Sequence, residues 1–215
     1  APRTIGWTFK PIVPGTSVDP QIVAAVAALA GRLADLGHRV ERTEPRWPLP
    51  TSAFLPQFYA GMRVEAGQVE HPDRLEPRTR ATVRLSRWAT PRVVERALRS
   101  GERVAASVDR LLDRHDVLVL PTMPVLPPPL GSLDGMGTMR AQLASTTVVG
   151  FTALTNVTGH PALSIPAGLS REGWPIGAQL IARHGQDGLL LALAAQLERA
   201  LPWPTPPDLG APSSG

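Results

Sequence analysis

The chain contains no cysteine among its 215 residues. This absence excludes disulfide frameworks, thiolate metal sites and cysteine nucleophiles, and it fits a reducing compartment. We therefore expect a cytoplasmic location. Long hydrophobic runs are also missing, because no apolar stretch reaches the roughly 18 residues that a membrane-spanning helix needs. The sequence thus predicts no membrane partner.

Lysine is almost absent as well. Lys10 is the single lysine, so arginine supplies nearly all of the 22 Lys+Arg residues that face 18 Asp+Glu residues. The arginines alternate with acidic residues at positions 92–96 and 110–114, a pattern typical of a solvated helix face. A nucleic-acid-binding surface would need an uninterrupted basic stripe. We therefore expect no nucleic-acid partner.

What is present is enough apolar material, 43% of the residues, to fill a large core. The chain lacks an initiator methionine and begins almost directly in a strand-like run. This favours an N-terminus made by cleavage or truncation.

The first elements read as strand, helix and strand. Residues 4–9 alternate apolar and polar side chains, which predicts a strand. Asp19 and Pro20 supply an N-cap and a first-turn proline for a helix that ends at Gly37, and residues 38–43 read as a second strand. Such a β-α-β unit predicts a parallel strand pair with a right-handed crossover.

The middle of the chain is predicted less completely. Residues 52–67 favour a helix, whereas 71–87 allow no assignment. A helix is expected to begin at Pro91 and to bury one apolar stripe. The stripe comprises Val94, Ala97, Leu98, Val104, Ala105, Val108, Leu111 and Leu112.

A continuous apolar run at 116–120 predicts a central strand buried on both faces, and the proline- and glycine-rich stretch 124–137 predicts a loop. A helix follows from residue 138. Two strand-like runs, 161–166 and 176–182, predict a hairpin with a glycine turn at Gly173. Asp187 is expected to cap a last amphipathic helix, which prolines end at 202–204.

A search for self-contained catalytic motifs finds none. The segment nearest to Gly-x-Ser-x-Gly, residues 15–19, lacks the closing glycine, and Lys10 has no Ser-x-x-Lys context. The five histidines are scattered, so no metal site is predicted, and no phosphate-binding glycine loop occurs. We expect no cofactor, and these residues alone indicate only an α/β domain.

Two segments, 151–168 and 173–181, closely resemble the C-terminal block of amidase-signature enzymes. Residues 116–124 and 189–198 match the same family in order, and the resemblance extends back to Thr4. It implies the C-terminal part of an α/β/α sandwich with a mixed β-sheet. On this basis residues 1–204 form that portion of the domain, and 205–215 form a flexible tail.

The resemblance implies hydrolysis of carboxamide C–N bonds to a carboxylic acid and ammonia or an amine. The family uses a serine nucleophile, a bridging serine on a cis peptide and a lysine base, carried by a Gly/Ser-rich segment and an upstream lysine that this chain lacks. Ser213 and Ser214 are adjacent but have no such context. No catalytic residue is therefore assigned, and the chain alone is expected to be inactive.

The expected partners are a small-molecule amide and the N-terminal catalytic segment of the same enzyme. An unpaired sheet edge also favours a homo-oligomer. A different hypothesis is a non-catalytic binding or scaffold module derived from the same fold.

Three residues are candidates for substrate binding: Phe151, Thr152 and Asn156. By resemblance, Phe151 and Thr152 form a wall of the acyl pocket, although ordinary core packing explains them equally well. Asn156 either contacts substrate or orients a loop through side-chain hydrogen bonds. Ser164 reads as a buried strand hydroxyl. Residues 147–150 lack the acidic residue of glutamine-specific relatives, which favours an apolar acyl group.

Overall fold

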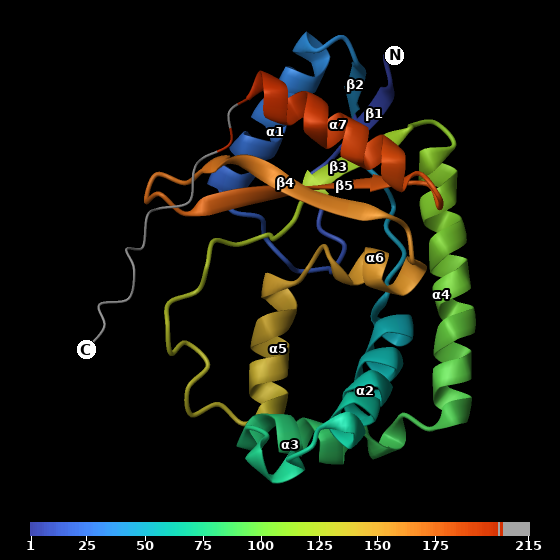
Figure 1. Cartoon of the computed structure of the whole chain (residues 1–215), viewed down its shortest axis with the longest axis vertical. Coiled ribbons are helices and arrows are strands. Elements are labelled where there is room, and N and C mark those ends of the chain that lie inside the picture. Colours follow the sequence, from blue (N-terminus) through green and yellow to red (C-terminus); the bar gives the residue numbers. More distant parts are fainter. Residues whose placement is uncertain (202, 204–215) are drawn as a thin grey trace.

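A five-stranded mixed sheet forms the centre of the molecule (Figure 1). The computed structural model describes residues 1–201 and 203, apart from the side chain of Thr147, so the predicted tail at 205–215 lies outside the described residues. The strands are β1 (Thr4–Trp7), β2 (Arg39–Arg42), β3 (Val117–Pro121), β4 (Ala162–Leu169) and β5 (Pro175–Ala182).

The strand order is β2-β1-β3-β5-β4. β1 pairs in parallel with β2 and β3, whereas β5 pairs antiparallel with β3 and β4. This confirms the parallel opening unit, the mixed sheet and the C-terminal hairpin. Every residue of β3 is buried, as its continuous apolar run predicts for a central strand.

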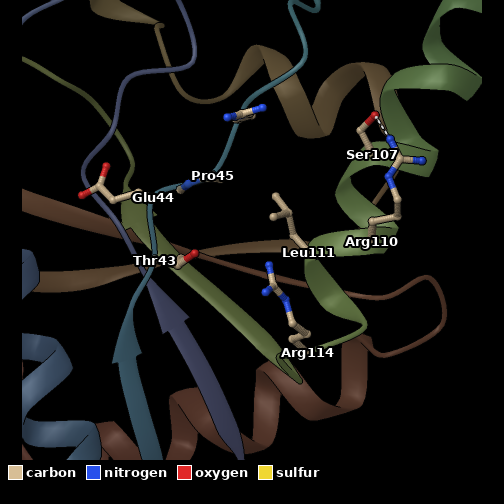
Figure 2. A pocket seen from close by; sticks show the side chains of 8 residues that line it. Thr43, Glu44, Pro45, Ser107, Arg110, Leu111 and Arg114 are labelled. Carbon is tan, nitrogen blue, oxygen red and sulfur yellow. Dashed lines mark hydrogen bonds between the residues drawn. The ribbon is translucent and has the colours of Figure 1, made fainter.

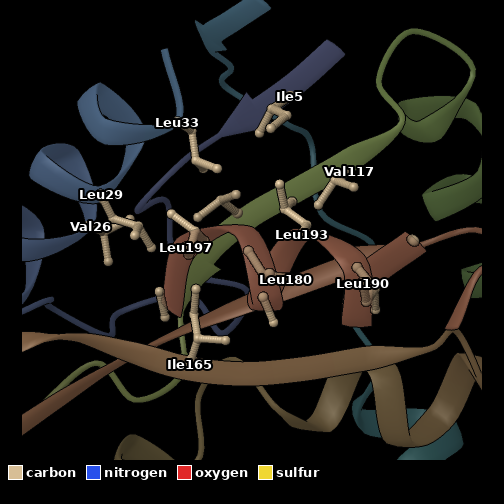
Figure 3. Packing of buried hydrophobic residues seen from close by; sticks show 14 residues of the cluster. Ile5, Val26, Leu29, Leu33, Val117, Ile165, Leu180, Leu190, Leu193 and Leu197 are labelled. Atoms are coloured by element: carbon tan, nitrogen blue, oxygen red, sulfur yellow. The ribbon is translucent and has the colours of Figure 1, made fainter. Parts of the chain in front are cut away.

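Helices α1 (Pro20–Asp35) and α7 (Asp187–Ala200) cover one face of the sheet (Figure 3). The Asp19 carboxylate accepts the Gln21 N–H at 2.8 Å, so the predicted cap of α1 is confirmed. The cap predicted for α7 is wrong: Asp187 is its first helical residue, after the N-cap Gln186. A turn closed by the Gln186 N–H and the Arg183 carbonyl starts the helix at that point.

Helices α4 (Pro91–Leu112) and α6 (Ala153–Thr158) cover the opposite face. The predicted stripe on α4 is buried at Val104, Val108 and Leu112. The prediction that Leu98 is buried is wrong, because this side chain is 51% exposed. This end of α4 extends beyond the sheet. A Cβ on Gly101 would lie 3.3 Å from the Val157 carbonyl oxygen, so the buried face of the helix at this end includes a glycine.

A helical lobe, which includes the unassigned stretch 71–87, lies below the sheet, and the lower half of α4 reaches it (Figure 1). It contains α2 (Thr51–Gln68), the 3-10 turns η1 (Pro72–Arg74) and η2 (Ser86–Trp88), α3 (Pro77–Leu85) and α5 (Thr138–Val148). The expected helix at 52–67 is confirmed. Arg63 ties the lobe together by donating to the Ser86 and Ala89 carbonyls at 3.0 and 3.1 Å. Among the described helices, none has the length and apolar character required to cross a membrane.

Candidate functional site

An apolar groove of about 300 Å³ lies at the carboxyl end of the central strand β3. Four separate parts of the chain form it: α1, the loop after β3, the end of α5 and the start of β5. Its lining residues include Ile22, Met123, Leu126, Val148 and Ile176. Because these side chains are almost all aliphatic, the groove suits an apolar group.

A pair of hydroxyl groups lies beside the groove. The Oγ1 of Thr122 and the Oγ of Ser164 are 2.7 Å apart. A Cβ on Gly177 would lie 3.0 Å from the first of these atoms and 3.1 Å from the second, so only glycine leaves room for the pair. The prediction that Ser164 is buried is wrong: it is exposed, because no described element covers that side of edge strand β4.

Gln179 neighbours this pair in the sheet. Its register partner across β4 is Ser164, and its partner across β3 is Leu120. The side chain is buried, with 4% exposure, and its Oε1 has no hydrogen-bond partner among the described residues. A buried acceptor without a partner costs free energy in a folded protein. Among the described residues, the Gln179 side chain therefore has an oxygen available to accept a hydrogen bond from a further group.

The three predicted substrate-binding residues do not line the groove. Phe151 is fully buried and packs in the core with Leu118 and Leu120 beneath α6. Thr152 is half-buried, and its hydroxyl donates to the Val149 carbonyl at 3.4 Å. Asn156 is exposed, and its side chain forms no hydrogen bond within the described part of the chain. Val148, three positions before Phe151, does reach the groove.

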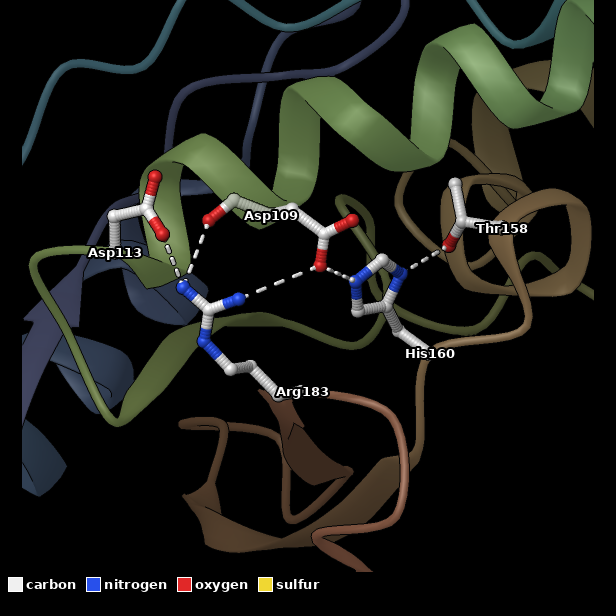
Figure 4. A network of polar contacts seen from close by, with 5 residues as sticks. All are labelled: Asp109, Asp113, Thr158, His160 and Arg183. Atoms are coloured by element: carbon white, nitrogen blue, oxygen red, sulfur yellow. Dashed lines mark hydrogen bonds and ion pairs between the residues drawn. The ribbon is translucent and has the colours of Figure 1, made fainter.

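A second polar cluster joins α4 to the ends of β4 and β5 (Figure 4). The two ring nitrogens of His160 contact Thr158 Oγ1 at 3.0 Å and Asp109 Oδ1 at 3.2 Å. Arg183 forms ion pairs with Asp109 and Asp113. The sequence gives no sign of this cluster, because its members are up to 74 positions apart.

The order hydroxyl, imidazole and carboxylate resembles a nucleophilic triad. Burial argues against that chemistry, since Thr158 is 7% exposed and the His160 side chain is fully buried. A substrate carbonyl has no path to the hydroxyl. Burial also lowers the pKa of His160, an effect opposed by the hydrogen bond that the ring donates to Asp109. The cluster therefore joins three elements as a structural network.

The described chain contains no serine–lysine pair for amide hydrolysis. Lys10 follows β1, and its side chain forms no hydrogen bond with a described serine; its backbone N–H donates to Thr8 Oγ1. Within residues 1–201 and 203, no three His, Asp or Glu side chains are arranged to hold a metal ion. The site thus supplies a groove and polar contacts without a nucleophile and base.

Comparison with known proteins gives a consistent result. The family model described as Amidase matches residues 5–191. A Mycobacterium tuberculosis protein described as "Putative amidase AmiB2" is 38% identical over 185 residues, which are 85% of this chain and 40% of the relative. The 6-aminohexanoate-cyclic-dimer hydrolase of Paenarthrobacter ureafaciens is 36% identical over 208 residues, covering 87% of this chain and 42% of that protein.

Solved structures agree with these relatives. The structure of 6-aminohexanoate cyclic dimer hydrolase superposes with a TM-score of 0.82 at 28% identity, over 94% of this chain and 46% of that chain. The same enzyme complexed with substrate gives 0.81 at 30% identity, over the same shares of both chains. This chain therefore spans less than half the length of the proteins it matches.

Proposed function

This chain belongs to the amidase signature family, and from that premise we propose that it is the C-terminal part of an amidase. The whole enzyme would hydrolyse a carboxamide to a carboxylic acid and ammonia or an amine. In this proposal the described chain supplies part of the sheet and of the substrate pocket. The serine nucleophile, bridging serine and lysine base belong to an N-terminal part that is not within this sequence.

One observation carries the proposal. The chain superposes on 6-aminohexanoate cyclic dimer hydrolase with a TM-score of 0.82, yet the side chain of its only lysine forms no hydrogen bond with a described serine. Amide hydrolysis needs an activated nucleophile and donors that stabilise the tetrahedral oxyanion. A scaffold that lacks these groups becomes catalytic only when another segment brings them.

The groove indicates the kind of amide. Its aliphatic lining favours an apolar acyl or amine portion, in agreement with the missing acidic residue at 147–150. Val148 links the groove to the turn that carries Phe151 and Thr152, so these two residues would shape the pocket from beneath. Asn156, which is exposed on α6, would reach substrate only after the N-terminal part covers this face.

The test is hydrolysis of hexanamide, benzamide and glutamine by this chain alone and by a mixture with an N-terminal amidase part. The probe for that part is the portion of AmiB2 that this chain does not match. We expect turnover of the two apolar amides in the mixture and none by either piece. Turnover by this chain alone would contradict the assignment of the catalytic residues to another segment.

A non-catalytic binding module is the second candidate, and one observation favours it. Helices in this chain already cover both faces of the central strand β3, with a separate core on each side. This reading predicts a monomer that unfolds cooperatively and binds amides without turnover in any mixture. Equilibrium dialysis with benzamide, in parallel with the activity assay, separates the two functions.

A further inference from the structure

A pocket lined by three arginines lies between α4 and the segment that follows β2 (Figure 2). Its volume is about 360 Å³. Leu111 on α4 and Arg114 in the turn just after that helix project toward the side that carries Thr43 and Pro45. The complete lining is Thr43, Glu44, Pro45, Arg46, Ser107, Arg110, Leu111 and Arg114.

The positive charge of this pocket is not neutralised by its neighbours. Glu44 at the rim pairs with Arg42, 2.8 Å away. Asp113, which lies between Arg110 and Arg114 in the sequence, pairs with Arg183 on the other side of the helix end. Acidic residues alternate with arginines in the sequence, but those near this pocket pair with arginines outside it.

The three guanidinium groups have few partners of their own. Arg110 donates to Ser107 Oγ at 2.8 Å. The side chains of Arg46 and Arg114 form no hydrogen bond or ion pair with any residue that the structure describes. Arg110 lies in the last turn of α4 and Arg114 just past its end, and because both line the pocket their like charges repel each other. An anion in the pocket would remove that repulsion.

The pocket is separate from the apolar groove. It lies beside β2, at one edge of the sheet, and none of its lining residues lines the groove, which Thr122 after β3 and the start of β5 help to form. Ligand binding in this pocket would therefore not depend on the proposed amidase function.

We propose that this pocket binds a small molecule that carries a phosphate group. Guanidinium groups donate paired hydrogen bonds to phosphate oxygens, and Thr43 and Ser107 add hydroxyl donors. A phosphate dianion balances more of the three positive charges than a single carboxylate does. Pro45, which is buried, and Leu111, which is half-buried, provide an apolar surface for the organic part of a phosphate ester.

The test is calorimetric titration of the full chain at low ionic strength with phenyl phosphate, inorganic phosphate and benzoate. We expect saturable binding of both phosphates, tighter for the ester, and at least tenfold weaker binding of benzoate. Arg46→Gln and Arg114→Gln should each weaken phosphate binding about tenfold, the effect of losing one charge-assisted contact. Leu111→Ala should weaken only the ester.

Arg99→Gln is the matched control, because Arg99 is another exposed arginine, on α4 away from the pocket, and it pairs with Glu95. It should leave phosphate binding unchanged. An equal loss in this variant would show a nonspecific charge effect and overturn the proposal, as would a dissociation constant above about 1 mM for both phosphates. Tighter binding of duplex DNA or of phosphatidic acid vesicles, unaffected by the Arg46 and Arg114 substitutions, would also overturn it.

Discussion

At the residue scale, the described glycine with the least room for a side chain is Gly6, which lies against the ring of His115. A Cβ on Gly6 would lie 2.9 Å from His115 Cδ2. The ring is buried and has no room to move, since its nitrogens contact the Leu111 carbonyl at 3.1 Å and Glu41 at 2.8 Å. We expect Gly6→Ala to lower the free energy of unfolding by about 1–3 kcal/mol in urea denaturation.

Gly31→Ala is the matched control, because Gly31 is exposed on α1 and its added Cβ meets nothing within 4 Å. Alanine there should stabilise the helix by about 0.5–1 kcal/mol. In a His115→Ala background, Gly6→Ala should cost much less. An equally large cost in that background would show that the imidazole is not the obstacle.

Replacing Gln179, unlike replacing Gly6, is not expected to lower the free energy of unfolding. Because its buried Oε1 has no partner among the described residues, Gln179→Met removes an unpaired acceptor and keeps the side-chain length. We expect the free energy of unfolding to stay constant or rise by up to about 1 kcal/mol. Gln196→Met is the comparison, since the Gln196 amide lies 3.1 Å from a ring nitrogen of buried His38 and should lose about 1 kcal/mol. A similar loss at Gln179 would mean that its amide is satisfied.

At the element scale, the sequence predicts those segments whose burial follows one simple pattern. α1 buries one helical face against the sheet, whereas β3 is a continuous apolar run because helices cover it on both faces, so both patterns are clear. The part of α4 beyond the sheet packs through Ala97 and Gly101, which carry little hydrophobic signal, and Leu98 therefore misleads. The sequence does not predict α3 for a related reason: Thr82 is its one buried residue.

The His160 network makes the junction of α4, β4 and β5 sensitive to pH. The pKa of His160 is below 6.5 in the folded chain, chiefly because burial disfavours the imidazolium. The unfolded chain thus binds a proton at higher pH than the folded chain does. The stability linked to His160 is full above pH 6.5 and is lost as the pH falls through and below that value.

Urea denaturation between pH 8 and pH 5 tests this sign. The wild-type chain should lose more stability on acidification than His160→Gln, because the glutamine cannot titrate. Taking the difference between the two proteins cancels the contribution of other titrating groups. A difference that stays constant or grows toward pH 5 would contradict the burial of a neutral imidazole at this position.

At the scale of the whole molecule, the family was predictable because its motifs are contiguous, and the groove was not. Residues 151–168 and 173–181 identify the family by local sequence alone. The groove brings together Ile22, Met123, Val148 and Ile176, which are separated by long stretches of chain. The packing of α1, the loop after β3, α5 and the start of β5 places them together, and no local pattern encodes that arrangement.

β4 is the longer of the two edge strands of the sheet. It has eight residues and pairs with β5 on one side only. The strand exposes alternate residues on its uncovered side: Ala162, Ser164 and Pro166. Ser164 is the residue that pairs with Thr122. Edge strands with free backbone groups pair with other chains unless charges block the approach. We therefore expect a concentration-dependent dimer, which sedimentation equilibrium would detect.

Ala162→Lys should shift this equilibrium to the monomer, because the ammonium group would lose its hydration in an edge-to-edge contact. Ala106→Lys is the matched control, since it adds the same charge at an exposed position on α4 and should leave the dimer intact. A wild-type chain that stays monomeric at every concentration would mean that Pro166 and the irregularity between Pro166 and Gly168 already protect the edge. Such a chain would need no N-terminal part to cover β4. This result would favour the non-catalytic binding module over the C-terminal part of an amidase.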